Sequence, residues 1–251
     1  MEKKLSIIIP AYNEQDRIVH TLEMTLAYLN SRPFRSEILV VSDGSTDGTA
    51  TVVRGFDSGS NVDLRLLEYF PNRGKGYAVR YGMLQGNAEV VMFMDADYSV
   101  DISEVEKGLD LIRAGAHVAI ASRSLAESRV SRHQNRAREL SAKLYTFIQN
   151  LYLGISFKDT QCGFKLFTFP AAQSLFLQQR LCSVIFDPEI LWLAVRSGYQ
   201  VAEFPVTWKH MEDSRIQYDS FRKFLFVFEE LLKIRKLHQQ DNTSAGRRRR
   251  G

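Results

Sequence analysis

Cysteine is scarce in this sequence of 251 residues, and long apolar runs are missing. The two cysteines, Cys162 and Cys182, have no metal-ligand spacing and fit reduced thiols in a cytosolic protein. No window of eighteen apolar residues occurs, and the apolar run that follows Met1–Lys4 has only five residues, too short for a signal peptide or a membrane span. We therefore expect a cytoplasmic protein in which no segment crosses a bilayer.

An excess of charge of one sign is also missing from most of the chain. Lys and Arg total 33 against 29 Asp and Glu, a net charge of +4, but Arg247–Arg250 supply four of the positive charges. Setting those four aside leaves 29 basic and 29 acidic residues, so the folded body is expected to be neutral and not to bind nucleic acid. The terminal arginines are either a site for anionic lipid or a solvated end.

Glycine is absent where a dinucleotide-binding fold requires it. The first apolar run, Leu5–Ile9, leads into Pro10–Glu14, which lacks the glycines that let a pyrophosphate approach the backbone. This argues against NAD or FAD. The segment offers instead the ring of Tyr12 for stacking on a base, with Asn13 and Glu14 as acceptors for a base or ribose. A turn that caps the next helix is the alternative.

Short apolar runs rich in β-branched residues alternate with segments of helical spacing. The runs are Leu5–Ile9, Glu37–Val41, Val62–Leu67, Val90–Met94 and Val118–Ala121. Helical spacing is found at two sets of positions, Ile18, Leu22, Leu26 and Leu29, then Val105, Leu109 and Ile112. This alternation predicts an α/β fold with a mostly parallel sheet flanked by helices, and ligands bound beyond the carboxyl ends of the strands.

The pattern changes after about Arg132. A long amphipathic stretch carries several large apolar residues on one side, namely Leu140, Leu144, Phe147, Ile148 and Leu151. Further on, residues 219–237 are aromatic and basic, with apolar side chains at helical steps. We predict a catalytic domain over residues 1–214, an amphipathic helix over 215–237 and a disordered basic tail over 238–251. The helix either lies at a membrane interface or docks on the protein's own core.

Two polar loops are expected at strand ends. Ser42–Thr49 places Asp43 where a carboxylate accepts hydrogen bonds from a base or ribose, although the same residues suit a tight turn and a helix cap. Asn72–Gly76 combines exposed backbone amides with the charges of Arg73 and Lys75, which suits a phosphate. A solvated turn is the alternative for this second loop.

Two carboxylates, Asp95 and Asp97, directly follow the fourth apolar run. At this spacing after a buried strand they repel each other unless a cation neutralises them. Mg²⁺ or Mn²⁺ bound by one or two carboxylates commonly takes the oxygens of a diphosphate as further ligands. A metal-assisted nucleotide site is therefore favoured over a pair of exposed turn aspartates.

These motifs in order, together with Asp159–Lys165 (DTQCGFK), resemble the inverting glycosyltransferases of family 2, which have the Rossmann-like GT-A fold. Within that family the sequence is most similar to the dolichyl- and polyprenyl-phosphate glucosyl- and mannosyltransferases, over roughly Leu5 to Ser214. The resemblance implies transfer of glucose or mannose, with UDP-glucose as the favoured donor, to polyprenyl or dolichyl phosphate. It also implies Mg²⁺ or Mn²⁺ as cofactor and a peripheral position at the cytoplasmic face of a membrane.

The resemblance further implies roles for individual residues. Donor binding is assigned to Pro10, Tyr12, Glu14, Asp43, Lys75 and Asp95. The metal is assigned to Asp95 and Asp97, and catalysis to Asp97, Arg123, Arg136 and Arg138. The acceptor phosphate is assigned to Arg132, Arg136 and Ser141, and a loop that closes over the site to Ser214 and Arg215. Where mannosyl members carry a glutamine as an extra metal ligand, this sequence has Ser99.

A phosphate acceptor is already anionic at neutral pH, so this reaction needs no strong general base and rests on positioning and charge stabilisation. Transfer to a soluble or protein-linked sugar is one alternative; it requires a carboxylate base, for which Asp159 is the candidate. A sugar nucleotidyltransferase would show a glycine-rich, arginine-containing loop after the first strand, which is absent. A non-catalytic nucleotide-binding scaffold is the last alternative, and the intact pair Asp95 and Asp97 argues against it.

Overall fold

The computed structural model describes residues 3–131, 136–209 and 221–248, and for residues 136–142, 221–225 and 240–248 it describes the backbone alone. The strands are β1 (Leu5–Ala11), β2 (Ser36–Asp43), β3 (Val62–Tyr69), β4 (Val90–Met94), β5 (Val118–Ser122), β6 (Arg129–Val130), β7 (Phe164–Thr168), β8 (Val201–Pro205) and β9 (Thr207–Trp208). The helices are α1 (Gln15–Asn30), α2 (Thr49–Arg54), α3 (Lys75–Gln85), the short 3-10 helix η1 (Ile102–Glu104), α4 (Val105–Arg113), α5 (Arg136–Leu153), α6 (Phe169–Gln178), α7 (Phe186–Arg196) and α8 (Phe221–Arg248).

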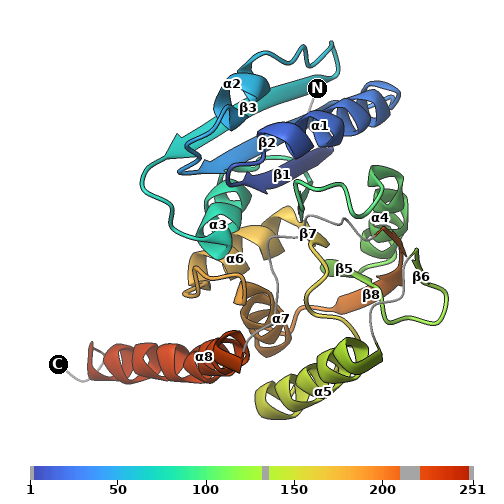
Figure 1. Ribbon diagram of the computed structural model, residues 1–251. Coiled ribbons are helices and arrows are strands. Elements are labelled where there is room, and N and C mark those ends of the chain that lie inside the picture. The colour runs from blue at the N-terminus through green and yellow to red at the C-terminus, as the bar shows by residue number, and fades with distance from the viewer. Residues whose placement is uncertain (1–2, 132–135, 210–220, 249–251) are drawn as a thin grey trace.

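One seven-stranded sheet forms the centre of the molecule, with the order β3-β2-β1-β4-β7-β5-β8 and helices on both faces (Figure 1). The pairs β1–β2, β1–β4, β2–β3 and β5–β8 are parallel, whereas β7 runs antiparallel to both β4 and β5. The strands β6 and β9 pair separately. The predicted α/β fold with a mostly parallel sheet is confirmed, and all five expected strands are present.

Successive side chains of the central strands enter cores on opposite faces of the sheet. In β1, Ile7 and Ile9 belong to the core that includes residues of α1 and α4. Ile8, between them, belongs to the core that includes residues of α3, α6 and α7. All three side chains are fully buried. Burial on both faces explains why these strands read in the sequence as continuous apolar runs.

The loop after β4 is fixed at the carboxyl edge of the sheet by contacts on both sides. The Thr21 hydroxyl of α1 donates a 2.7 Å hydrogen bond to the carbonyl of Ala96. The backbone N–H of Asp95 donates to the carbonyl of Gly163, just before β7, at 3.1 Å. The antiparallel strand β7 thus brings the DTQCGFK segment against the loop that carries Asp95 and Asp97.

Helices α5 and α8 pack together at the end of the molecule drawn lowest in Figure 1. The rings of Tyr145 and Phe228 lie 5.7 Å apart between centroids, and the Tyr152 hydroxyl donates to the carbonyl of Leu232 at 3.3 Å. In the part of the chain with described coordinates, no helix combines the length and apolar character needed to span a membrane.

Of the two positions considered for the C-terminal helix, the structure shows docking on the core along one side of α8. Leu231 and Ile234 are buried in the same core as α7. The helix begins at Phe221 and continues to Arg248, so it extends through residues 238–248, which were expected to be disordered. No proline occurs in this segment, and its helical hydrogen bonding can therefore continue.

Candidate active site

The loops that follow β1 and β2 are hydrogen-bonded to each other at the carboxyl edge of the sheet. Asn13 accepts from the backbone N–H of Thr46 at 2.7 Å, and the N–H of Glu14 donates to the Thr49 hydroxyl at 2.8 Å. Parallel pairing of β1 with β2 places both loops at this edge. The segments Pro10–Glu14 and Ser42–Thr49, each predicted to contact the nucleoside, therefore form one surface.

Three residues predicted to bind the nucleoside have distinct positions on this surface. Pro10 lies within β1. Tyr12 follows the strand and is 43% exposed, so its ring is accessible for stacking. The Glu14 carboxylate is held by the guanidinium of Arg17, with 2.6 Å between Oε2 and Nε. Their roles in donor binding remain predictions.

Asp43, at the end of β2, binds the loop that follows β3. Its carboxylate accepts hydrogen bonds from the backbone N–H groups of Arg73 at 2.7 Å and Gly74 at 2.9 Å. The Asn72 amide donates to the same carboxylate at 3.0 Å. Asp43 therefore fixes the Asn72–Gly76 loop directly. Its predicted contact with the donor base would use a lone pair of the carboxylate that these three hydrogen bonds do not occupy.

Glycines let the Asn72–Gly76 loop pack closely on the segment between α6 and α7. Gly74 has φ of +96°, and a Cβ added there would lie 2.5 Å from the carbonyl oxygen of Cys182. A Cβ on Gly76 would lie 2.7 Å from the carbonyl oxygen of Ser183. The N–H of Gly76 donates to the Cys182 carbonyl at 2.9 Å. Backbone contact on this side and Asp43 on the other define the position of Lys75.

Lys75 begins α3 and reaches across the edge to the loop after β4. Its Nζ lies 2.5 Å from Oδ1 of Asp95. Burial by itself would lower the pKa of the Lys75 ammonium, but the neighbouring carboxylates of Asp95, Asp187 and Asp97 outweigh it, and the pKa is raised. The structure thus brings together two sequence-predicted donor-binding residues and keeps a fixed positive charge beside the carboxylate pair.

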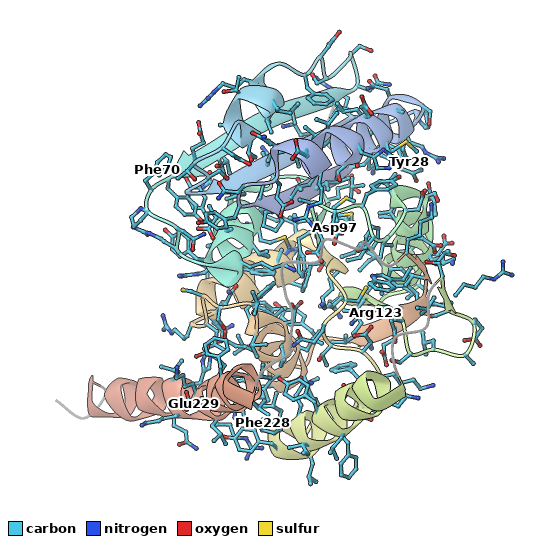
Figure 2. All side chains as sticks on the ribbon, in the orientation of Figure 1. Tyr28, Phe70, Asp97, Arg123, Phe228 and Glu229 are labelled. Atoms are coloured by element: carbon cyan, nitrogen blue, oxygen red, sulfur yellow. The ribbon has the colours of Figure 1, made fainter. Side chains whose placement is uncertain are left out.

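Asp97 is the second carboxylate of the pair and lies near the centre of the molecule (Figure 2). Burial and the nearby Asp95 carboxylate raise its pKa, although the N–H of Ser99 donates to its Oδ1 at 3.0 Å and opposes the shift. Ser99 thus orients Asp97 through its backbone. Burial is the larger cause of the raised pKa, and repulsion from Asp95 adds to it; a cation bound between the two carboxylates would relieve that repulsion.

The residues fit a divalent cation of the kind that shares its ligands with a diphosphate. Within the described residues, no cluster of three or more His, Cys, Asp or Glu side chains forms a metal cage. Mg²⁺, however, is usually held by only one or two carboxylates, with substrate phosphates and water completing the shell. Asp95 and Asp97 provide that number of carboxylates, at the edge where the fold binds ligands.

Gly163 shapes the site in a way that the sequence motif did not reveal. A Cβ added at Gly163 would lie 2.1 Å from Oδ2 and 2.5 Å from Oδ1 of Asp95. The Asp95 carboxylate therefore occupies the space of a side chain, and only glycine is compatible with this arrangement. The motif matched a family signature, but the contact depends on the pairing of β4 with β7, which sequence spacing does not predict.

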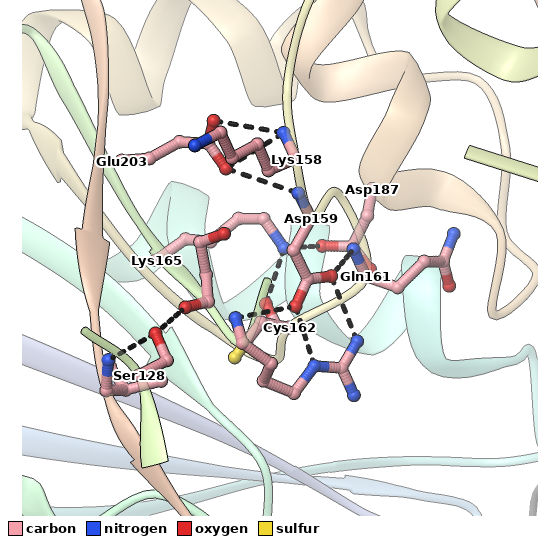
Figure 3. Close-up of polar contacts among 11 residues, drawn as sticks. Ser128, Lys158, Asp159, Gln161, Cys162, Lys165, Asp187 and Glu203 are labelled. Atoms are coloured by element: carbon pink, nitrogen blue, oxygen red, sulfur yellow. Dashed lines mark hydrogen bonds and ion pairs between the residues drawn. The ribbon is translucent and has the colours of Figure 1, made fainter. Parts of the chain in front are cut away.

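Lys165 and Asp187 form a buried ion pair (Figure 3). The Lys165 Nζ lies 2.5 Å from Oδ1 of Asp187 and 2.6 Å from the carbonyl oxygen of Cys162. Burial raises the pKa of Asp187, an effect that the Lys165 ammonium opposes. Burial also raises the pKa of the Cys162 thiol to about 12, so this cysteine stays protonated and unreactive. No local sequence pattern predicts this pair.

Arg123, at the end of β5, makes a bidentate ion pair with Asp159. Its Nε lies 2.6 Å from Oδ2, and its terminal nitrogen lies 2.9 Å from Oδ1. The N–H of Gln161 also donates to Asp159, at 3.0 Å (Figure 3). Burial alone would raise the pKa of Asp159, but Arg123 outweighs it and lowers the pKa to about 2.

This pairing corrects one expectation and qualifies another. Asp159 was the candidate base for a soluble acceptor, but a carboxylate with a pKa of about 2 and both oxygens engaged is a poor proton acceptor. Arg123 was predicted to act on the reacting phosphates. Its side chain is 32% exposed, so part of it is accessible to a ligand while Asp159 fixes its orientation.

The remaining predicted residues are not tested by the described coordinates. Arg132, Ser214 and Arg215 lie outside the described residues. Arg136, Arg138 and Ser141 lie in the first turns of α5, where only the backbone is described. The predicted acceptor-phosphate site and the predicted closing loop therefore stay predictions.

Fold and site together define an α/β protein in which two carboxylates and a lysine meet at the carboxyl edge of the sheet. The family model "Glycosyl transferase family 2" matches residues 6–176, and the chain belongs to this family.

Curated relatives agree with that assignment. A dolichyl-phosphate β-glucosyltransferase of Trichomonas vaginalis is 36% identical over 84% of this chain and 66% of its own length. The human dolichyl-phosphate β-glucosyltransferase is 32% identical over 93% of this chain and 75% of its own length. The chain thus spans about two thirds to three quarters of these relatives.

A solved structure shares the fold. Glucosyl-3-phosphoglycerate synthase from Mycobacterium tuberculosis, solved with Mn²⁺, UDP and glucosyl-3-phosphoglycerate, aligns with a TM-score of 0.67 at 18% identity, covering 92% of this chain and 80% of the other. The predicted GT-A fold is thereby confirmed.

Proposed function

We propose that this protein transfers glucose from UDP-glucose to a polyprenyl phosphate such as dolichyl phosphate, with inversion at the anomeric carbon. The observation that carries this proposal is the convergence of Asp95, Asp97 and Lys75 at the carboxyl edge of the sheet. Support for the sugar and the acceptor comes from the names of the relatives, and support for the nucleotide comes from the UDP complex of the structural neighbour.

The donor side of the reaction is assigned to the loops after β1, β2 and β3. Tyr12 would stack on the base, and the carboxylates of Glu14 and Asp43 would accept from base or ribose. Lys75 would stabilise negative charge on the diphosphate as it leaves, because its position is fixed by the loop glycines and Asp43 before any ligand binds.

Asp95 and Asp97 are the residues that would hold a divalent cation, Mg²⁺ or Mn²⁺. When bound, such a cation neutralises the charge that develops on the leaving diphosphate. Lys75 holds the Asp95 carboxylate, for which Gly163 leaves room, and the N–H of Ser99 orients the Asp97 carboxylate. Both contacts hold the carboxylates in position before the donor arrives.

The acceptor side needs arginines rather than a base. A lipid phosphate is anionic at neutral pH and would attack the anomeric carbon from the face opposite the nucleotide. Arg123, held by Asp159, and Arg132, Arg136 and Arg138 near the start of α5 would offset the repulsion between the phosphates of donor and acceptor. The low pKa of Asp159 fits this scheme, because Asp159 then orients Arg123 instead of accepting a proton.

A lipid acceptor requires contact with a membrane, and α5 offers an apolar face for it. Leu144, Phe147 and Leu151 are 55%, 65% and 74% exposed and lie on one side of the helix, at spacings of three and four residues. Phe226 and Leu232 are exposed on the adjacent α8. We infer that this end of the molecule rests peripherally on the cytoplasmic leaflet, where reduced thiols such as Cys162 and Cys182 persist.

Transfer of label tests this function directly. The purified chain is incubated with Mg²⁺, a polyprenyl phosphate and, in separate reactions, labelled UDP-glucose, UDP-galactose or GDP-mannose, and the lipid phase is extracted. We expect label in the lipid from UDP-glucose. Label only in water-soluble or protein-linked sugar would contradict the acceptor, and no transfer from any donor would favour a non-catalytic scaffold.

A further inference from the structure

A cavity of about 350 Å³ lies among α5, α7 and α8, away from the carboxyl edge of the sheet. Its walls are formed by Leu153, Trp192, Arg196, Arg235, His238 and Gln239. Arg196 ends α7, and Asp187, whose carboxylate helps to raise the pKa of Lys75, lies in its first turn. At a rise of roughly 1.5 Å per residue, the two lie roughly 13 Å apart along the helix axis. A ligand in this cavity is therefore separate from the reacting groups.

The cavity has a cationic lining without a matching carboxylate. The Arg196 guanidinium lies 4.7 Å from the ring centroid of Trp192, and that of Arg235 lies 4.9 Å from the ring of Tyr152. Over the described part of the chain, neither guanidinium has an Asp or Glu within ion-pair distance. A guanidinium stacked on a ring keeps its N–H donors at its edge, where they can bind a planar or tetrahedral oxyanion.

The acidic side chain that contacts the cavity wall already has partners inside the protein. Glu189 lies under the cavity and is fully buried; it contacts Nε2 of His238 at 2.7 Å. It also accepts from the backbone N–H groups of Arg180 and Leu181, both at 2.9 Å. These contacts hold His238 and α8 in place, so Glu189 does not neutralise the guanidiniums of Arg196 and Arg235, which solvent can reach.

We propose that this cavity is a second phosphate site, which binds a phosphate monoester through Arg196 and Arg235. The ring of Trp192 and the side chain of Leu153 give it an apolar wall, so the ligand chemistry is a phosphate next to apolar or neutral atoms. An anionic lipid headgroup and free phosphate share this chemistry. The position beside α5, whose apolar face is exposed, makes a headgroup the source that we expect.

Two binding measurements distinguish the sources. The chain has only two tryptophans, so in a Trp208→Phe chain the fluorescence reports on Trp192 in the cavity wall. Inorganic phosphate is titrated into that chain, and in parallel the full-length protein is sedimented with phosphatidylcholine vesicles that do or do not contain phosphatidic acid. A response to inorganic phosphate identifies free phosphate as a ligand, and binding only to phosphatidic acid vesicles identifies the headgroup; both support the site.

Two double variants are compared. Arg196→Gln/Arg235→Gln removes two positive charges from the cavity, and the control Arg54→Gln/Arg65→Gln removes two positive charges from α2 and β3. We expect the first to lose about tenfold in affinity for phosphatidic acid vesicles, and the second to bind like the wild type. Thermal denaturation checks that both fold. Binding of the cavity variant that equals the wild type in both measurements would overturn the site.

A third variant separates a built site from general attraction to negative charge. Arg196→Lys/Arg235→Lys keeps both charges but loses the planar fork and its stacking. We expect this variant to bind phosphatidic acid vesicles less tightly than the wild type. An affinity equal to that of the wild type would overturn a site built from the two guanidiniums. Glucose transfer in detergent should be unchanged in all three variants, so this inference and the proposed function can fail independently.

Discussion

Two regions of this molecule, the carboxyl edge of the sheet and the end formed by α5 and α8, differ in how many of their polar and apolar side chains have partners within the protein. At the carboxyl edge, the Asp43 carboxylate accepts three hydrogen bonds from one neighbouring loop, and Lys75 is paired with Asp95. At the end formed by α5 and α8, Phe147 and Leu151 of α5 are exposed to solvent. The first region is preorganised for a small polar ligand. The second leaves an apolar surface uncovered, as expected of a region that meets a membrane.

Asp97→Asn should produce the largest loss of activity, since it removes one negative charge from the carboxylate pair at the preorganised site. Asparagine keeps the size of the side chain and an acceptor for the N–H of Ser99. We expect transfer of labelled glucose to fall about a thousandfold, which corresponds to about 4 kcal/mol of transition-state stabilisation. Asp101→Asn, in the same loop but capping η1, is the control and should stay active. Near-normal activity of Asp97→Asn would remove the carboxylate pair from the mechanism.

Gly163→Ala tests whether the position of Asp95 matters as much as its charge. The added Cβ would lie 2.1 Å from Oδ2 of Asp95, so the carboxylate must move. A displacement of this size at a catalytic group costs about a hundredfold, and we expect that loss in kcat/KM. Gly55→Ala is the matched control, because its nearest neighbouring atom would lie 3.4 Å away. Equal activities of the two variants would show that the close contact is unimportant.

The fold was predictable from the sequence because its main signals are local. The continuous apolar runs and the helical spacing at Ile18 and Leu22 gave the parallel strands and α1, and the polar loops fell at the expected edge. A short strand near Leu166 was also expected, and β7 (Phe164–Thr168) confirms it, but its antiparallel pairing with β4 and β5 could not be predicted in the same way. The strand follows β4 only after η1, two α-helices and two strands, and its pairing depends on contacts far apart in the chain.

The same reason separates the site residues that were found from those that were missed. Asp95, Asp97 and Lys75 stand in short motifs, and the structure places them together. Lys165 and Asp187 meet only after β7 and α7 have packed, so no local pattern connects them. Asp159 was named only as the base that a soluble acceptor would require, and its ion pair with Arg123 was missed because it is also formed between distant segments.

Asp159→Asn should have a moderate effect that depends on pH. The pKa of Asp159 is about 2 in the folded protein and 3.8 as its ordinary value, so the folded state stabilises the carboxylate. This contribution is fully present above about pH 4 and is lost as the pH falls through 2; its size is about 2 kcal/mol. Urea unfolding at several pH values should therefore show a difference between wild type and variant that shrinks below about pH 4.

The control for this prediction is Asp110→Asn, which breaks an exposed ion pair with Arg113. Exposed pairs contribute about 0 to 1 kcal/mol, so the control should be nearly as stable as the wild type at every pH. A difference between Asp159→Asn and wild type that stayed constant from pH 7 to 2 would contradict the assigned pKa.

Substitutions on the exposed apolar face of α5 should have the smallest effect on catalysis. Leu144→Ser, Phe147→Ser and Leu151→Ser combined should weaken binding to anionic vesicles about fivefold, because even partial burial of three such side chains is worth about 1 kcal/mol or more. Transfer measured in detergent should be retained. Leu177→Ser, at another exposed apolar residue, on α6, is the matched control. Equal vesicle binding by triple variant and control would mean that another surface meets the membrane.

Calorimetric titration of UDP, with and without Mn²⁺, tests most directly whether Asp95 and Asp97 join a cation to the diphosphate of the donor. For the wild type we expect Mn²⁺ to raise UDP affinity about tenfold or more, and for Asp97→Asn we expect the two affinities to be equal. The same UDP affinity for the wild type in the presence and absence of Mn²⁺ would contradict the assignment of this carboxylate pair.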